Sequence, residues 1–351
     1  MAQRPAGPTM SSSFSVPSIA YRGQVADRTT GPDVKGKTSD SGPSSSPAHY
    51  AHPRSGLSKI RYLLREPSAE FLGTMLLVMF GNAANCQVVL SSSTAVASSP
   101  KGDYLALSFG WSAGIALGAW VSAGISGGHI NPAITIAMAV FRGFSWKKVP
   151  GFIFAQMLGG WVGASLVYAN YYRAIHLFDA NLVDKSISHT AASLFATFPA
   201  PYLSNAQSFF QEFLATAILV LMVLAATDKS NGPPPKGLVP LVLFITMLGI
   251  SSCFGMQTSF SLNPARDLGP RLMCWMVAYG REVWNFRSQY WIYAPTMGPI
   301  VGALTGTALY DILVFTGHES IFNKGQVTSG DVVVQDESDV SHESSGGRIS
   351  V

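Results

Sequence analysis

Long apolar segments alternate with short polar connections through the middle of the chain. Six of them are long enough to cross a membrane, because a helix needs about 20 apolar residues to span the hydrocarbon core. They cover roughly 68–91, 104–124, 148–170, 208–227, 238–256 and 290–315. Two shorter apolar pieces lie in the connections, at 131–141 and 263–278. At 1.5 Å per residue, helices of that length reach only about half way across a bilayer. The pattern predicts an all-α membrane protein with six transmembrane helices and two re-entrant half-helices.

Both short pieces begin with the same three residues, Asn131-Pro132-Ala133 and Asn263-Pro264-Ala265. Asn is favoured as a helix N-cap and Pro at the first helical position, so each triplet predicts a helix start. A helix that starts at mid-membrane depth leaves non-helical backbone there, which is tolerated only where it lines a cavity or is buried in protein. The two triplets therefore indicate an aqueous path.

The two halves of the chain repeat each other. Glu70-Phe71-Leu72-Gly73-Thr74 in the first apolar segment matches Glu212-Phe213-Leu214-Ala215-Thr216 in the fourth. Each half then holds three spans and one half-helix. Because three is an odd number, the second half is inverted relative to the first. Inverted repeats that meet at the bilayer midplane are a recurrent architecture of transport proteins.

Composition agrees with a membrane protein and places its boundaries. The chain is 48% hydrophobic and 12% charged, whereas soluble proteins carry about 25% charged residues. Residues 1–57 and 318–351 are polar and lack periodicity, which predicts disordered tails, the second one acidic. The membrane domain is expected at 58–317, with repeats over about 68–170 and 208–315.

Charge and cysteine content exclude several functions. The net charge of +4 is small and scattered, which does not favour nucleic-acid binding. The three cysteines lack the spacing of a disulfide framework or a metal site. We expect no metal and no cofactor.

Lys and Arg gather before the first span and in two connections on the same side, so both tails are expected in the cytoplasm. These residues are Arg54, Lys59, Arg61, Arg65, Arg142, Lys147, Lys148, Lys229 and Lys236.

The segments Ser126–Ala133 and Phe260–Asp267 resemble the paired signatures of the major intrinsic proteins, the aquaporins and aquaglyceroporins. The resemblance covers the six spans and both half-helices, and neither tail. It implies an aquaporin-like fold and a passive channel in the plasma membrane. It also implies a homotetramer with one pore per subunit, and no enzymatic reaction.

Physical chemistry gives the two asparagines a role in such a pore. Two facing helix N-termini place two positive dipole ends at one point, and Asn131 and Asn263 add side-chain amide donors. Water or an alcohol accepts these hydrogen bonds, whereas a cation is repelled. A proton wire is broken because the central oxygen is held as an acceptor. The alternative role, capping the two half-helices, is compatible with this one.

Arg266 follows Asn263 by three residues, at a membrane depth where a charge is costly. It has no acid three or four residues before it. The position predicts a pore donor that also repels cations. The alternative is a structural ion pair with Asp267.

The resemblance implies a narrow filter completed by Trp111, Ser251 and Phe260 beside Arg266. An aromatic at Trp111, a small residue at Ser251 and an acid at Asp267 are similar to the polyol-conducting branch. In that branch the span-5 position often carries Gly rather than Ser. The alternative for the two aromatics is ordinary core packing.

Three further polar residues lie inside the predicted spans or beside the first triplet. By resemblance, Glu70 and Glu212 are structural acids that accept hydrogen bonds from the backbone leading into the half-helices. A proton relay in a coupled carrier is the alternative. His129 either lines the pore entrance and orients solute or is a packing histidine.

These observations predict a passive channel for glycerol, other small uncharged solutes and water. A strict water channel and a proton-coupled polyol transporter are the alternatives. An enzyme is disfavoured because no nucleophile, base and orienting group occur together outside the spans.

Overall fold

The computed structural model describes residues 56–323, and that part of the chain is helical without a strand. Within this described part, five helices are long and apolar enough to cross a membrane. They are α2 (Arg65–Ser92), α3 (Tyr104–Ser126), α5 (Val149–Ala180), α6 (Asn205–Thr227) and α7 (Val239–Thr258). The shorter helices are α1 (Gly56–Leu63), α4 (Pro132–Phe141), α8 (Pro264–Cys274), α9 (Glu282–Asn285), α10 (Tyr290–Ile292) and α11 (Gly298–Leu313). The described segment also holds two short 3-10 helices, η1 (Ala191–Leu194) and η2 (Lys236–Leu238). Two short π-helices complete it, η3 (Trp275–Tyr279) and η4 (Tyr293–Met297).

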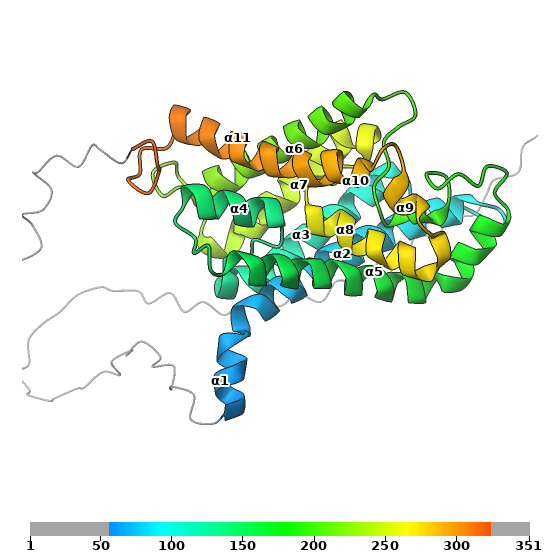
Figure 1. Ribbon diagram of the computed structural model, residues 1–351, viewed down its shortest axis with the longest axis horizontal. Coiled ribbons are helices and arrows are strands. Elements are labelled where there is room, and N and C mark those ends of the chain that lie inside the picture. The colour runs from blue at the N-terminus through cyan, green and yellow to red at the C-terminus, as the bar shows by residue number, and fades with distance from the viewer. Residues whose placement is uncertain (1–55, 324–351) are drawn as a thin grey trace, which may run out of the picture. The chain divides into compact units, whose positions relative to one another are not determined.

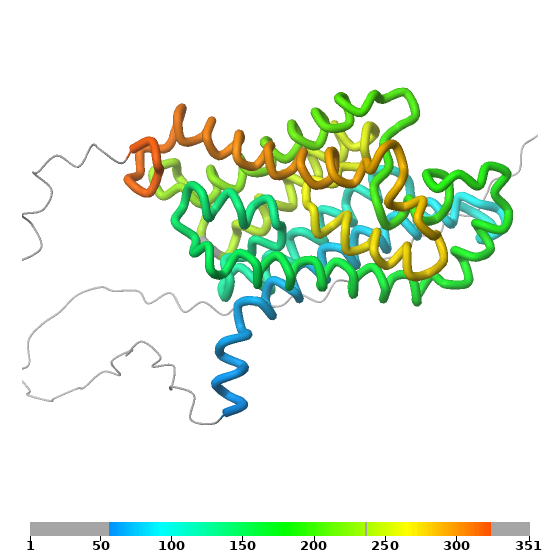
Figure 2. Tube along the Cα trace, viewed as in Figure 1, coloured from blue at the N-terminus to red at the C-terminus, as the bar shows by residue number. Residues whose placement is uncertain are grey.

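The predicted fold class is confirmed. The long helices lie side by side, and the short helices α4 and α8 fill the space between them (Figure 1). The trace in Figure 2 shows the chain entering α4 and α8 from opposite ends of the bundle, so that the two helix starts approach each other near its middle. This is the arrangement that an inverted repeat with two half-helices requires.

The sixth span differs from the regular helix predicted over 290–315. It begins as α10 and the π-helix η4, and is a regular α-helix only from Gly298. Pro295 has no N–H and its ring clashes with the carbonyl four residues back, which breaks a helix at that point. The freed carbonyl of Trp291 accepts the hydroxyl of Thr296 instead, at 2.7 Å. The second half-helix is also shorter than predicted: α8 ends at Cys274 and is followed by η3, where the backbone leaves helical angles at Val277 and Ala278 (φ 87°).

Glycines set the spacing between neighbouring helices. A Cβ at Gly118 in α3 would collide with the carbonyl oxygen of Gly73 in α2. A Cβ at Gly302 in α11 would collide with the carbonyl oxygen of Phe213 in α6. Each glycine belongs to a row of glycines spaced four residues apart, a spacing that allows close approach of membrane helices. The rows are Gly110, Gly114 and Gly118 in α3, and Gly298, Gly302 and Gly306 in α11. The same device therefore operates in both halves.

One end of the bundle holds the start of α2 and the end of α11, and is called the terminal end here (Figure 1). Arg142, just after α4, pairs with Asp311 of α11 at 2.5 Å, and Ser320 donates to the same carboxylate at 2.7 Å. The predicted tails, 1–57 and 318–351, lie outside the described residues except at their inner ends. At the N-terminal boundary the described helix α1 begins at Gly56.

Candidate functional site

The loops that enter α4 and α8 share an unusual backbone conformation. Ile130 and Leu262, each just before a capping asparagine, have φ values of 42° and 55°. This region is uncommon for any residue other than glycine and a real outlier for a β-branched one. Strain of this kind costs about 1–3 kcal/mol and persists only where the surroundings impose it. The following contacts identify what imposes it.

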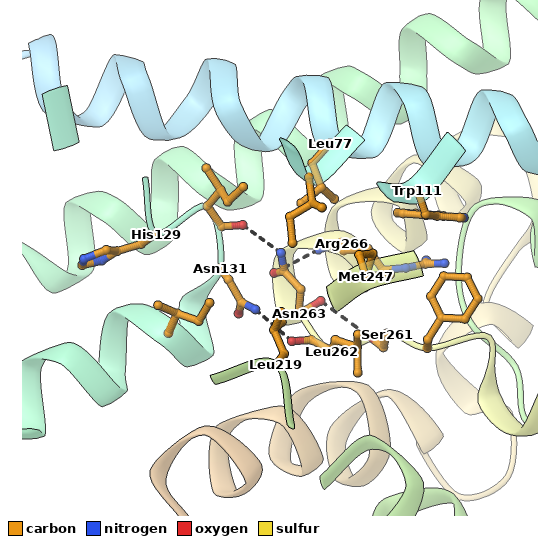
Figure 3. Close-up of a pocket in the computed structure, with 14 residues that line it drawn as sticks. Leu77, Trp111, His129, Asn131, Leu219, Met247, Ser261, Leu262, Asn263 and Arg266 are labelled. Atoms are coloured by element: carbon orange, nitrogen blue, oxygen red, sulfur yellow. Dashed lines mark hydrogen bonds between the residues drawn. The ribbon is translucent and has the colours of Figure 1, made fainter. Parts of the chain in front are cut away.

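The N–H of each strained residue is held by a buried acid. The Ile130 N–H donates to Glu70 Oε2 at 2.6 Å, and the Leu262 N–H donates to Glu212 Oε2 at 2.8 Å. The carbonyls point the other way, toward the opposite loop. Asn263 Nδ2 donates to the Ile130 oxygen and Asn131 Nδ2 to the Leu262 oxygen, both at 2.8 Å (Figure 3). The two half-helix starts are thereby tied to each other across the pseudo-symmetry axis.

Each asparagine also caps its own helix. Asn131 Oδ1 accepts the Ala133 N–H at 2.9 Å, and Asn263 Oδ1 accepts the Ala265 N–H at the same distance. An amide nitrogen carries two hydrogens, and the cross-loop bond uses one of them. Both residues line a cavity, so the second hydrogen of each remains a donor for a molecule inside it.

Glu70 and Glu212 are fully buried, and each carboxylate accepts several hydrogen bonds. Besides Ile130, Glu70 accepts from Ser126, His129 and Gln156. Glu212 accepts from Thr258, Ser261 and Leu262. A buried carboxylate is tolerable when it is hydrogen-bonded in this way. Neither acid lines the cavities described next.

Three adjoining cavities run through the bundle. The middle one measures about 30 Å³, room for roughly one or two waters. The cavity on the side away from the terminal end measures about 360 Å³, and the one toward the terminal end about 160 Å³. The middle cavity shares Trp111, Phe260 and Arg266 with the larger one, and Ile115, His129 and Ile130 among others with the smaller one. A narrow passage between two wider openings is the form of a pore.

Three predicted filter residues meet where the narrow cavity joins the larger one. The guanidinium carbon of Arg266 lies 4.2 Å from the centre of the Trp111 ring. The Trp111 and Phe260 rings stand at 89° to each other, with centroids 5.8 Å apart. Arg266 Nη1 donates to the Phe195 carbonyl at 2.9 Å, and its Nε has no partner among the described residues. Apolar ring carbon and cationic donors therefore face one space.

Ser251, the fourth predicted filter residue, is placed differently. Its hydroxyl turns back to the Met247 carbonyl at 2.8 Å, as buried Ser side chains in helices do when no other acceptor is near. Ser251 lines none of the three cavities, whereas Met247, one turn earlier in α7, lines the narrow one. The Ser251 carbonyl accepts the Tyr104 hydroxyl at 3.3 Å. The predicted position and the side chain that reaches the cavity therefore lie on the same helix, one turn apart.

His129 both lines cavities and packs against other rings. It lines the narrow cavity and the one toward the terminal end. Its Nδ1 lies 3.2 Å from Thr135 Oγ1, and its ring packs against Phe144 and Phe152 with centroids 4.8 and 5.5 Å apart. The ring is thus held in place where it meets the path.

Asn85 is a site residue that sequence reasoning missed. Its Oδ1 accepts Trp111 Nε1 at 3.0 Å, and its Nδ2 donates to the Leu194 carbonyl at 2.8 Å. The indole N–H is therefore occupied away from Arg266, and Trp111 offers carbon to the passage. No local sequence pattern predicts these two hydrogen bonds, because the partners of Asn85 lie 26 and 109 residues away along the chain.

Asp267 does not line the cavities, and it does not pair with Arg266. Its carboxylate binds Arg271 at 2.7 Å and accepts the Thr197 N–H at 2.7 Å. Arg271 in turn donates to the carbonyls of Thr197 and Val283. The i,i+4 spacing of the pair was the available signal for Arg271. The Asp267–Arg271 pair therefore fixes the loop whose Phe195 carbonyl accepts the hydrogen bond from Arg266.

Arg271→Leu is expected to lower the free energy of unfolding by about 3–5 kcal/mol, because Asp267 is left as a buried charge without its partner. Thermal unfolding of the detergent-solubilised protein measures this. Arg281→Leu, at an exposed position, is the control and should change little. The double variant Asp267→Leu/Arg271→Leu should recover part of the loss. Equal unfolding temperatures for Arg271→Leu and Arg281→Leu would contradict this role.

A contact between Asp184 and His189 lies beside the larger cavity, which His189 lines. Asp184 accepts the Ser186 N–H at 2.8 Å, and its other oxygen lies 2.7 Å from His189 Nδ1. The hydrogen bonds from Ser186 and the attraction to His189 hold the pKa of Asp184 below its usual range. Asp184 is therefore negative at neutral pH, next to a histidine that lines the opening.

Similarity to known proteins extends over the same part of the chain. Residues 57–310 match the family model described as major intrinsic protein. Aquaporin-6 of Laccaria bicolor is 53% identical over 266 residues, 76% of this chain and 85% of that protein. Aquaglyceroporin-9 of Botryotinia fuckeliana is 42% identical, over 75% of this chain and 57% of that protein. The X-ray structure of the aquaglyceroporin from Plasmodium falciparum matches with a TM-score of 0.62 and 33% identity, over 72% of this chain and 97% of that one.

Proposed function

The chain belongs to the major intrinsic protein family, whose members are membrane channels and not enzymes, and we propose that it conducts glycerol, other small uncharged solutes and water down their gradients. The observation that carries this proposal is the two-sided lining of the narrow cavity. Trp111 and Phe260 supply carbon surface, and Arg266 supplies charged donors beside them. Glycerol has the same two-sided character, with carbon-bound hydrogens on one side and hydroxyls on the other.

Passage through the filter follows from this lining. The carbon backbone of glycerol slides along the Trp111 and Phe260 rings, which provide an apolar wall without donors. Its hydroxyls accept from the guanidinium of Arg266, and then from Asn131 and Asn263, which line the same cavity. Each hydrogen bond is replaced by the next along the path, so the solute loses little of its hydration without compensation.

Ions and protons meet a barrier in the same places. Arg266 repels cations at the narrow entrance, and the N-termini of α4 and α8 place positive dipole ends at the asparagines. The asparagine amides offer donors and leave the solute oxygen as an acceptor. A continuous chain of water molecules therefore has no consistent direction in which to pass a proton.

The two alternatives make different demands on the site. A strict water channel needs a bulkier or more rigid group in the narrow cavity than the flexible Met247, the α7 side chain that lines it. A proton-coupled polyol transporter needs a titratable group in the path. Glu70 and Glu212 line none of the three cavities, which leaves His129 as the histidine or acid that lines the narrow part.

Stopped-flow light scattering of proteoliposomes tests the proposal. We expect both water and glycerol permeability well above that of empty liposomes, with glycerol flux linear in concentration and insensitive to a pH gradient. Water permeability without glycerol permeability would establish the strict water channel. Saturating, uphill glycerol uptake driven by a pH gradient would establish the coupled transporter. Either result overturns the proposal.

Asn85→Leu is expected to reduce glycerol permeability several-fold more than water permeability. A buried indole N–H without an acceptor costs about 1–3 kcal/mol, so Trp111 is expected to turn its N–H toward the passage and lose its apolar face. The control is Asn82→Leu, one turn earlier in α2, since the buried Asn82 amide has no partner among the described residues. Equal glycerol-to-water ratios in both variants would contradict the role of Asn85.

We also propose that the terminal end faces the cytoplasm of a cell whose plasma membrane holds the channel as a homotetramer. Lys147, Lys148 and Lys229 are exposed at this end, in agreement with the positive-inside rule. Large apolar side chains such as Phe80, Trp120 and Phe154 are exposed along the sides of the bundle, where lipid or neighbouring subunits cover them. Chemical cross-linking in native membranes tests the tetramer, and labelling of Lys147 from either side of sealed vesicles tests the orientation.

A further inference from the structure

Helix α1 carries large apolar side chains that nothing in the described part of the chain covers. It has no buried residue, and Leu57, Ile60 and Leu63 are 77%, 53% and 75% exposed. A helix this short is marginal in water without packing of its apolar face. Its apolar residues therefore need a surface outside the bundle.

The side chains of α1 divide into an apolar arc and basic flanks. At about 100° per residue, Leu57, Ile60 and Leu63 fall within about 120° of one another. Lys59 lies beyond one edge of this arc and Arg61 beyond the other, both exposed. No acidic residue occurs within the helix. This distribution is typical of helices that lie in a membrane interface with basic side chains reaching the headgroups.

A proline turns α1 away from the axis of α2. Pro67 has no N–H to give to the Leu63 carbonyl, and its ring crowds that carbonyl, so a continuous helix is broken there. The structure shows α1 ending at Leu63 and leaving the bundle at a steep angle to α2 (Figure 1). Because α2 crosses the membrane, α1 is directed along the membrane surface.

We propose that α1 is a binding site for anionic lipid headgroups, lying flat at the terminal end of the channel. Its apolar arc enters the boundary of the acyl chains, and Lys59 and Arg61 bind the headgroup charges. Lipid is favoured over a protein groove because α1 is joined to a membrane span and its height is thereby set at the bilayer boundary. The proposal takes only the cytoplasmic orientation from the proposed function, since anionic lipids are concentrated in that leaflet.

A fluorophore on the full-length chain tests the apolar arc. Cys253 is exposed and is replaced by Ser, whereas Cys86 and Cys274 are buried. An environment-sensitive dye is attached at Leu57→Cys, and accessibility to the neutral quencher acrylamide is measured. We expect protection in phosphatidylcholine vesicles that contain phosphatidylserine, and much less in phosphatidylcholine alone. The matched control is the same dye at Tyr62→Cys on the opposite face, which should stay accessible in both.

Two variants test the charges and the kink. Lys59→Gln/Arg61→Gln should lower the ratio of protected to accessible dye in phosphatidylserine vesicles by about 25-fold, or about five-fold per residue, since one basic residue near such a surface contributes about 1 kcal/mol. Pro67→Ala should also expose the dye, because the restored hydrogen bond extends α2 straight into solution.

Protection that is equal with and without phosphatidylserine would overturn the proposal. So would protection that vanishes when vesicles hold one channel each, since a neighbouring copy would then be the partner. Vesicles of symmetric composition make the assay independent of orientation. Glycerol flux is measured in the same vesicles, so failure of the lipid site and failure of the proposed channel function are recorded separately.

Discussion

Glu212→Leu is expected to reduce water and glycerol permeability to that of empty liposomes. The carboxylate accepts from Thr258, Ser261 and Leu262, and each buried donor left without a partner costs about 1–3 kcal/mol. Leu262 also loses the contact that holds its φ at 55°. When it relaxes, its carbonyl turns away from Asn131 and the passage is lost.

Two further variants separate loss of the passage from loss of the fold. Glu212→Gln keeps one acceptor oxygen and should fold with a lowered unfolding temperature and partial conduction. Glu70→Leu should behave as Glu212→Leu does, because Glu70 holds Ile130 in the same way. Glu282→Leu, at an exposed acid, is the control. Conduction of Glu212→Leu at the normal rate would show that the loop keeps its conformation without the acid.

The features that could be predicted from the sequence are those set by local chemistry. Apolar length gives the spans, and Asn followed by Pro gives the two half-helix starts, which begin at Pro132 and Pro264 as expected. The inverted repeat follows from an odd number of spans. The break in the sixth span was not predicted, although Pro295 inside the predicted helix was a signal for it. These properties need no knowledge of distant contacts.

The features that could not be predicted depend on contacts between remote segments. Asp267 accepts the N–H of Thr197, which lies 70 residues away along the chain. The sequence around Asp267 therefore does not predict that it holds the loop at Thr197. The contact between Asn85 and Trp111 is hidden for the same reason. Ser251 has the expected spacing, but a hydroxyl bonded to its own helix leaves Met247 to line the cavity. Spacing points to the helix, and packing decides which side chain of that helix reaches the cavity.

The second large effect is expected from Trp111, which we propose to be the apolar wall of the filter. Its ring is 2% exposed and lies between Arg266 and the backbone of α2 at Gly81. Trp111→Ala removes this wall and should raise the permeability of a five-carbon polyol by about ten-fold or more, since steric discrimination in apolar pockets is worth about that per added carbon. Trp120→Ala, at an exposed tryptophan on the outside of α3, is the control.

Gly81→Ala should act in the opposite direction at the same position. A Cβ at Gly81 would collide with the Trp111 ring, and the ring can only move toward the passage because α2 lies behind it. We expect glycerol permeability to fall by about ten-fold while water permeability falls much less, since one added methyl is enough for such discrimination. Iso-osmolar glycerol swelling and osmotic water flux on the same proteoliposomes measure both quantities. If Trp111→Ala and Gly81→Ala change the polyol-to-water ratio in the same direction, Trp111 does not set the width of the filter.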